Sequence, residues 1–258
     1  MLIMGGYNVK VLICVDDTDS LDKSTSTGKI TGDIKRTIEE NNLGVCEDIT
    51  RHQLLLHPDI PYTSHNSSMC FAAEIDQKNS DEIISRAVDI IINGMADEAD
   101  PGLCLCSPQL INKNDQQKLI NFGQSAQKEV LTKKDAYDLA EVLHIHLSEH
   151  GGTGQGIIGA LAGVGLRLSG NDGTYKGKLQ ITASRDDGLV SVDEICCQTH
   201  CDEVRDFSGN MSLPKDQLIE LGSYAKAVLR DNKKIVLVIP DDNGTYITCS
   251  KEQIRGGR

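Results

Sequence analysis

Three aspartates close the first apolar run of the sequence and could bind a hard cation. Val11 to Val15 are apolar and predict a short buried strand. The polar residues that follow it are Asp16-Asp17-Thr18-Asp19-Ser20. They should turn the chain at the strand's C-terminal end, where open α/β sheets bind ligands. Crowded carboxylates repel one another unless water or Mg²⁺ lies among them, so the run predicts a Mg²⁺ site at Asp16, Asp17 and Asp19.

A hydroxyl-rich loop follows and leads into a helical pattern. Its residues are Ser24-Thr25-Ser26-Thr27-Gly28. A helix N-terminus attracts anions, so metal-binding carboxylates beside it predict a phosphate-handling corner. Ser26 and Thr27 are its candidate catalytic hydroxyls, and Thr18 and Ser20 are candidate nucleotide contacts. The structural alternative is that Asp and Ser serve here only as turn and helix-capping residues.

A second candidate site is rich in glycine. The residues concerned are His150-Gly151-Gly152-Thr153-Gly154-Gln155-Gly156, and a helical run of small residues follows them. Glycines allow close backbone approach to an anion, and the helix start offers free N–H groups, which predicts nucleotide binding. A tight turn with close helix packing is the alternative. The run is not a P-loop, because no Gly-Lys-Ser/Thr follows, and no convincing buried strand precedes it as in a Rossmann fold.

Three motifs, in this order, resemble those of the archaeal agmatinylcytidine synthetases, which modify an isoleucine tRNA. They are the aspartate run 16–20, the segment His57-Pro58-Asp59-Ile60-Pro61-Tyr62, which is the weakest, and the segment Gly154 to Gly165. The resemblance covers residues 9–180 in patches. It implies an ATP-using α/β domain combined with a ferredoxin-like domain.

The resemblance also implies roles for particular residues. Asp16, Asp17 and Asp19 would hold Mg²⁺ and the nucleotide phosphates, Ser26 or Thr27 would stand where the family has its loop threonines, and Gly152 to Gly156 would cradle phosphate. In that family ATP activates the base oxygen of a cytidine by phosphorylation, and a loop threonine takes part. The cofactors implied are ATP and Mg²⁺.

This sequence departs from the family mainly by losing positive charge. The residues Thr63-Ser64-His65-Asn66-Ser67 replace a loop that carries Lys and Arg, and Gln155 stands where Arg is common. Thr25 replaces a cysteine, and there is no sequence room for the family's oligonucleotide-binding fold and zinc ribbon. Because tRNA binding needs several Lys or Arg contacts, the parts that hold RNA are predicted to be missing.

The composition sets limits on location and partners. The chain has 258 residues, a net charge of −12, 3% aromatic residues and nine cysteines. Lys133-Lys134, Lys233-Lys234 and the end Arg255-Gly256-Gly257-Arg258 are small, scattered basic groups, so no DNA partner is expected. The sequence shows neither a secretion signal nor a membrane span, and the odd cysteine count lacks framework spacing, which together predict a cytoplasmic protein with reduced thiols.

The order of helical and strand patterns predicts an α/β (α+β) protein. We expect a mixed-sheet nucleotide-handling domain with a ferredoxin-like region over residues 1–189, and a small C-terminal α/β subdomain over 190–258. Within the latter, 216–229 is predicted to be helical. Residues 235–249 are predicted to form a β-hairpin with an Asn-Gly turn, and 179–184 is a candidate strand.

A cysteine cluster could bind zinc. Cys196, His200 and Cys201 could supply ligands, but adjacent cysteines at 196 and 197 seldom both bind one ion, and packed thiols are the alternative.

The sequence as a whole predicts an ATP- and Mg²⁺-dependent phosphotransferase or ligase whose acceptor is a small molecule or RNA. Two alternatives are a tRNA-modification enzyme that takes its RNA-binding parts from a partner chain, and a non-catalytic nucleotide-binding scaffold. No membrane partner is expected, and a homo-oligomer stays open.

Overall fold

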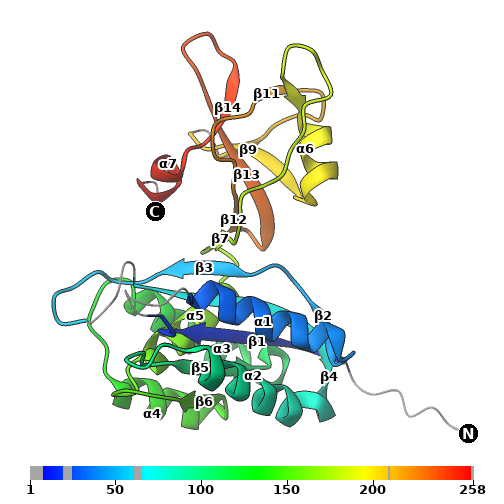
Figure 1. Ribbon diagram of the computed structural model, residues 1–258. Coiled ribbons are helices and arrows are strands. Elements are labelled where there is room, and N and C mark those ends of the chain that lie inside the picture. The colour runs from blue at the N-terminus through cyan, green and yellow to red at the C-terminus, as the bar shows by residue number, and fades with distance from the viewer. Residues whose placement is uncertain (1–7, 20–24, 61–65, 209, 257–258) are drawn as a thin grey trace, which may run out of the picture. The chain divides into compact units, whose positions relative to one another are not determined.

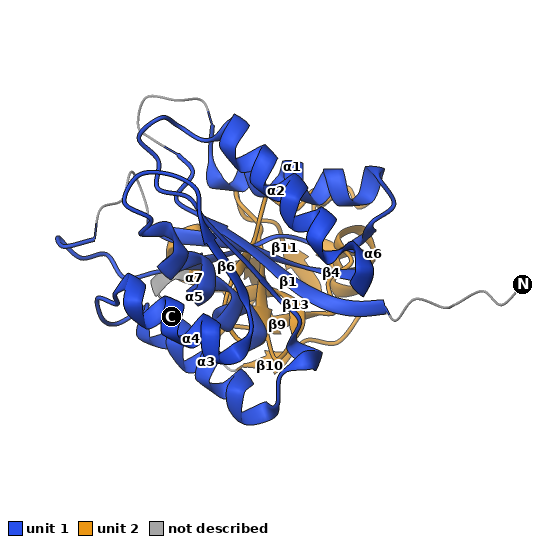
Figure 2. Cartoon of the chain, turned by 90° about the horizontal axis from the view of Figure 1, so that it is seen from below, with its two compact units in different colours: residues 1–169 blue, residues 170–258 orange. Residues whose placement is uncertain are grey.

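A computed structural model describes residues 8–19, 25–60, 66–208 and 210–256, with the elements labelled in Figure 1. The chain divides into two compact units, residues 1–169 and 170–258, which are coloured separately in Figure 2. Among the described residues, no helix has both the length and the apolar character that crossing a membrane requires. All nine cysteines are free thiols.

The first unit alternates strands and helices. Its elements are β1 (Asn8–Asp16), α1 (Thr27–Glu40), β2 (Gly44–Cys46), β3 (Thr50–Gln53), β4 (Ser67–Asp76), η1 (Gln77–Asn79), α2 (Ser80–Gly94), β5 (Gly102–Cys106), η2 (Pro108–Leu110), α3 (Lys113–Ser125), α4 (Lys133–Leu143), β6 (His146–Glu149) and α5 (Gly156–Leu168). Its strands lie in the order β6-β5-β1-β4-β3, every neighbouring pair is antiparallel, and β2 also pairs with β4. The core order β5-β1-β4-β3, with α1 and α2 as crossovers, is ferredoxin-like, which confirms the predicted fold class.

The sheet of the first unit is covered on both faces. Figure 2 shows α1 and α2 on one side of β1 and β4, and α3, α4 and α5 on the other. Alternate residues of β1 face opposite layers, so Val11 and Ile13 pack with α1 and α2, whereas Leu12 and Cys14 pack with α3, α4 and α5. Both faces of the strand are therefore apolar, as the unbroken apolar run predicted.

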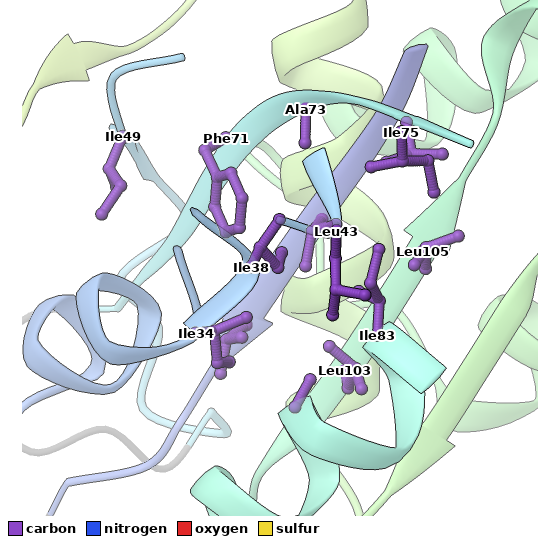
Figure 3. Packing of buried hydrophobic residues seen from close by; sticks show 14 of the residues in the cluster. Ile34, Ile38, Leu43, Ile49, Phe71, Ala73, Ile75, Ile83, Leu103 and Leu105 are labelled. Atoms are coloured by element: carbon purple, nitrogen blue, oxygen red, sulfur yellow. The ribbon is translucent and has the colours of Figure 1, made fainter. Parts of the chain in front are cut away.

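The layer of α1 and α2 holds the larger side chains. Ile34 and Ile38 of α1 meet Phe71 of β4, and Ile83 of α2 lies near Leu103 of β5 (Figure 3). All five side chains are fully or almost fully buried. This packing fixes the start of α1 beside the end of β1, where the aspartates leave the sheet.

Glycines let helix α5 lie directly on the opposite face. A Cβ added to Gly159 would overlap the carboxylate of Asp16, and one on Gly163 would overlap the side chains of Cys14 and Ser68. A Cβ on Gly156 would overlap the backbone oxygen of Asp100. Close packing at these three glycines explains why the helix consists of small residues.

The second unit is smaller and mainly β. Its elements are β7 (Thr174–Tyr175), β8 (Val190–Ser191), α6 (Val192–Thr199), β9 (Glu203–Asp206), β10 (Met211–Ser212), β11 (Leu218–Glu220), β12 (Ala227–Arg230), β13 (Lys233–Pro240), β14 (Tyr246–Thr248) and α7 (Lys251–Gly256). The strands run in the order β7-β12-β13-β14-β11-β8, while β9 pairs in parallel with β13 and antiparallel with β10.

Two predictions for the second unit are wrong and one is confirmed. The antiparallel pair of β13 and β14 is the expected hairpin. Residues 216–229 are not helical but contain β11 and β12, because Ile219 pairs with β14 and the N–H of Gly222 donates to Thr248 Oγ1 at 2.8 Å. Residues 179–184 form no strand, although Leu179 packs into the core of this unit. Tertiary pairing overrides local propensity in these segments.

The compact units divide after residue 169, whereas the sequence placed the boundary after 189. Residues 170–189 group with the second unit because Thr174 of β7 pairs with Val228 of β12, and the N–H of Leu179 donates to the carbonyl of Ala225 at 3.1 Å. No proline-rich or charged linker marks either position in the sequence.

Candidate functional site

The acidic turn, residues Asp16 to Asp19, begins with a buried carboxylate. Asp16 is the last residue of β1 and is 7% exposed, with its Oδ2 lying against Gly159 of α5. Burial raises its pKa well above the ordinary value, and the charges of Asp17 and Asp19 raise it further. A cation bound beside this carboxylate would stabilise its charged form.

Asp17 turns the chain out of the sheet. Its φ of 53° is left-handed, a conformation that Asp adopts more readily than most residues. Burial raises the pKa of its carboxyl to about 6, with further contributions from Asp100 and Asp19. Asp17 is therefore the residue of the acidic turn that lies closest to the effect of another acidic residue, Asp100.

The hydroxyl corner is tied to the acidic turn through Thr27. Thr18 is buried, and its Oγ1 donates to Thr27 Oγ1 at 3.3 Å, while Thr27 Oγ1 donates to Asp19 Oδ1 at 3.4 Å. Ser26 instead caps α1, because its Oγ accepts from the N–H of Lys29 at 3.2 Å. Thr27 is thus the better placed of the two candidate hydroxyls. Ser20 and Ser24 lie outside the described residues.

Asp100 joins the acidic turn to the glycine-rich loop. Its N–H donates to the carbonyl of Asp17 at 3.1 Å, and its carbonyl accepts from the N–H of Gly156 at 3.0 Å. Its carboxylate accepts from Thr153 Oγ1 at 2.5 Å and from the N–H of Gly154. Asp100 is only 9% exposed. One residue therefore positions both predicted halves of the site.

Strand register explains why these segments meet. Asp16 on β1 is opposite Gly102 on β5, and Gly102 is opposite Glu149 on β6. Antiparallel pairing brings the end of β1, the start of β5 and the end of β6 together at the same end of the three strands. The acidic turn, Asp100 and the glycine-rich loop extend from these strand ends.

The glycine-rich loop is shaped by left-handed backbone at two glycines. Gly152 has a φ of 51° and Gly154 a φ of 76°, which other residue types seldom adopt. A Cβ on Gly152 would lie 3.0 Å from Asp100 Oδ1, and a Cβ on Gly151 would lie 3.0 Å from the carbonyl oxygen of Ala99. Gln155 precedes α5 without a side-chain capping bond. The N–H of Gly154, which was expected to meet phosphate, meets Asp100.

His150 belongs to a row of side chains along β6. The N–H of His150 donates to the carbonyl of Pro101 at 2.9 Å. Its Nε2 lies 2.8 Å from Ser148 Oγ, which lies 3.0 Å from Nε2 of His146. Burial lowers the pKa of both imidazoles, so both rings are neutral at pH 7. The ring of His150 is thus tied to the strand by Ser148.

Sequence reasoning missed Asp100, Glu149 and Lys133. Lys133 Nζ donates to the carbonyl of Thr153 at 2.7 Å and forms an ion pair with Glu149. Asp100 could have been noticed as an acid directly before the Pro101-Gly102 break, because a residue that precedes proline is disfavoured in a helix. Lys133 carried no signal, because only the fold brings the start of α4 to the loop.

The expected metal ligands do not form a closed cage. Among residues 8–19, 25–60, 66–208 and 210–256, no three His, Cys, Asp or Glu side chains are grouped as a metal site. Asp16 lies against α5, whereas Asp17 interacts with Asp100. Mg²⁺ commonly takes only one or two protein carboxylates, with water and phosphate as its other ligands, so Asp17, which the charges of Asp100 and Asp19 affect, could serve as one ligand of this ion.

The predicted zinc ligands Cys196, His200 and Cys201 are also not grouped as a metal site in the described part of the chain. Cys201 Sγ lies 3.4 Å from Cys196 Sγ, and Cys201 is buried in the core of the second unit. The described geometry therefore favours packed thiols over a zinc site.

The raised pKa of Asp17 leads to a prediction about pH. Because the folded chain retains this proton to about pH 6, the contribution of Asp17 to the free energy of unfolding falls as pH rises from about 4 to about 6. Asp17→Asn keeps a residue suited to left-handed backbone, so it should be more stable than the parent at pH 7 by about 2 kcal/mol, and equal to it near pH 4. Thermal melts with chelator across this range test the prediction, and a difference independent of pH would contradict it.

Comparison with known proteins gives structural relatives only. No family model matches the chain, and the search of curated proteins finds no match. Among solved structures, the chain resembles TiaS, a tRNA agmatidine synthetase, in its complex with an isoleucine tRNA and ATP, at 27% identity and a TM-score of 0.52 over 61% of this chain. A TiaS complex with the same tRNA, AMPCPP and agmatine matches at 26% identity and 0.50 over 60%, and a tRNA fluorescent labeling enzyme at 28% and 0.50 over 60%.

In each of these matches the aligned part makes up 36% of the other chain. The chain therefore spans about a third of the length of these relatives. Two of these TiaS structures are complexes with ATP or its analogue AMPCPP. In its mixed α/β fold and these matches, this chain resembles part of the TiaS structures.

Proposed function

We propose that the chain is an ATP- and Mg²⁺-dependent enzyme of the phosphotransferase or ligase type, with the nucleotide bound where the acidic turn meets the glycine-rich loop. The observation that carries this proposal is the position of Asp100, which is hydrogen-bonded to Asp17 on one side and to Thr153 and Gly154 on the other. The TiaS complexes with ATP and AMPCPP support the choice of nucleotide.

The acidic residues suit a metal-bound polyphosphate. Asp17 would hold Mg²⁺ together with Asp19 or Asp100, since these are the carboxylates whose charges act on Asp17. Bound Mg²⁺ would neutralise phosphate charge. Asp16 is buried behind the turn with its Oδ2 against Gly159 of α5, and a bound cation would favour its charged form.

Thr27 is the hydroxyl with a defined role in this proposal. It donates to Asp19 and accepts from Thr18, so the hydroxyl proton has a fixed direction and one oxygen lone pair is left for a further partner. The free end of α1 adds partial positive charge beside it. Positioning and charge stabilisation of this kind supply most of the rate in phosphoryl transfer.

The chemical nature of the acceptor distinguishes the proposed enzyme from its alternatives. The net charge of −12 disfavours RNA binding by this chain alone, so a tRNA acceptor would require RNA-binding parts from another chain. A small-molecule amine or hydroxyl needs no such partner. The pairing of the Gly154 N–H with Asp100 removes one donor from a phosphate cradle, and this favours a non-catalytic nucleotide-binding protein as the second candidate. The nine free thiols agree with a cytoplasmic location.

The proposal predicts that Asp16→Asn and Asp19→Asn each abolish Mg²⁺-dependent ATP binding with little loss of fold. Calorimetric titration with ATP, with and without Mg²⁺, measures the binding, and thermal melts measure the fold. Asp33→Asn is a matched control, because Asp33 lies on α1 and pairs with Arg36 away from the turn. Unchanged affinity in both site variants would contradict the assignment. A screen of amines and RNA as acceptors then separates enzyme from scaffold.

A further inference from the structure

The proposed nucleotide site carries more negative charge than one metal ion can balance. Asp16, Asp17, Asp19 and Asp100 lie in or beside it, and a nucleotide triphosphate would add several more charges. Like charges at this separation disfavour binding unless cations are supplied. The protein should therefore contribute a positive side chain at the loop.

Lys133 is the lysine that the fold brings to this loop. It is the first residue of α4, whose start is fixed by a capping box between Thr132 and Asp135. Its Nζ donates to the carbonyl of Thr153 at 2.7 Å, and Thr153 Oγ1 donates to Asp100. Lys133 is thus one residue away from the carboxylate that joins the two halves of the site.

Glu149 and Gly154 hold this ammonium group in place. Lys133 pairs with Glu149, at the end of β6, and a Cβ on Gly154 would overlap the Glu149 carboxylate and crowd Lys133 Nζ. Glycine at 154 therefore makes room for the ion pair on the outer side of the loop. An ammonium has three N–H donors, and Thr153 and Glu149 account for two of them. The Lys133 side chain is 29% exposed, so a ligand can reach the third donor.

We propose that Lys133 is a phosphate-binding residue of the nucleotide site, with Glu149 and the Thr153 carbonyl as its positioning partners. The inference rests on the proposed function and assigns the cation of that site to α4. A lysine is a mobile point charge that commonly binds phosphate. The alternative role is a structural one, in which Lys133 only fastens the loop to α4.

The neighbouring lysine provides a matched control. Lys134 also lies in the first turn of α4, but it pairs with Asp138 on the same helix and its side chain is 81% exposed. Lys133→Gln and Lys134→Gln remove the same charge from adjacent positions. Lys133→Arg keeps the charge and the donors.

The experiment compares ATP with AMP in the presence of Mg²⁺ for the intact chain and these variants, by calorimetry. Lys133→Gln should weaken ATP binding by about tenfold or more and AMP binding much less, because a charge-assisted contact to the outer phosphates is lost. Lys134→Gln should change neither by more than about twofold, and Lys133→Arg should retain most of the ATP affinity.

Three results would overturn the inference. Unchanged ATP affinity in Lys133→Gln excludes phosphate contact, and equal weakening of ATP and AMP indicates the structural role. Equal loss in Lys133→Gln and Lys134→Gln indicates a general charge effect. If the unaltered chain binds neither nucleotide, the proposed function fails as well, so the two failures are distinguishable. Should Lys133→Gln be unstable in a thermal melt, Lys133→Arg decides, since loss of ATP binding there contradicts the inference.

Discussion

Gly159→Ala is expected to remove Mg²⁺-dependent nucleotide binding while the chain stays folded. The new methyl group would occupy the position of Asp16 Oδ2, and it would lie 3.0 Å from Leu54 Cδ1. Because the obstructing atom is the end of a side chain, the carboxylate can rotate away instead of the helix shifting. The aspartate turn then loses its innermost charge, and affinity for the metal-nucleotide should fall about 10- to 100-fold.

Calorimetric titration with Mg²⁺-ATP measures this loss, and a thermal melt shows that the fold persists. Gly94→Ala is a control for the added methyl group, because its Cβ would meet only the Ile30 side chain, at an ordinary 3.4 Å, and would not touch Asp16. Normal ATP affinity in Gly159→Ala would mean that Asp16 does not contribute to the site.

Gly156→Ala, one helical turn earlier, is expected to damage the fold itself. Its methyl group would overlap the backbone oxygen of Asp100 and come within 2.7 Å of the Gly102 amide nitrogen. Backbone atoms of a buried strand cannot rotate away, so α5 must move off the sheet. We expect the free energy of unfolding to fall by about 3 kcal/mol, which corresponds to a melting temperature lower by about 5–10 °C.

Gly159→Ala is expected to lose nucleotide binding and Gly156→Ala to lose stability, so comparing the two variants tests both predictions. Thermal melts of Gly156→Ala and Gly159→Ala, run beside Gly94→Ala, should rank Gly156→Ala as by far the least stable. A melting temperature of Gly156→Ala within about 2 °C of the parent would contradict the close approach of α5 to Asp100 and Gly102.

Features that the sequence predicted well depend on neighbouring residues. The apolar run into Asp16 and Asp17 indicated both the buried strand and its polar end, because burial and charge are properties of the residues themselves. The ferredoxin-like order of strands and helices followed from periodicity in the same way. The small residues of 156–165 also indicated close helix packing, although not what the helix would contact.

Features that the sequence did not predict depend on distant partners. Asp100 looked like part of a chain break, and only the pairing of β1 with β5 places it between the turn and the loop. Lys133 looked like scattered surface charge until α4 was positioned. The prediction of a helix over residues 216–229 was wrong for the same reason, because Ile219 pairs with β14 instead.

The hydrogen bonds that join His146 and Ser148 of β6 to His150, just after the strand, all run in one direction. The Ser148 hydroxyl has one proton, so it can donate to only one of the two imidazole nitrogens, and the other ring must donate to the serine oxygen. Because both rings are neutral, they are opposite tautomers. Reversing the row requires a proton to enter at Nδ1 of one ring and another to leave at Nδ1 of the other. Each reversal therefore carries one net proton along the edge strand, between the start of the glycine-rich loop and the far end of β6.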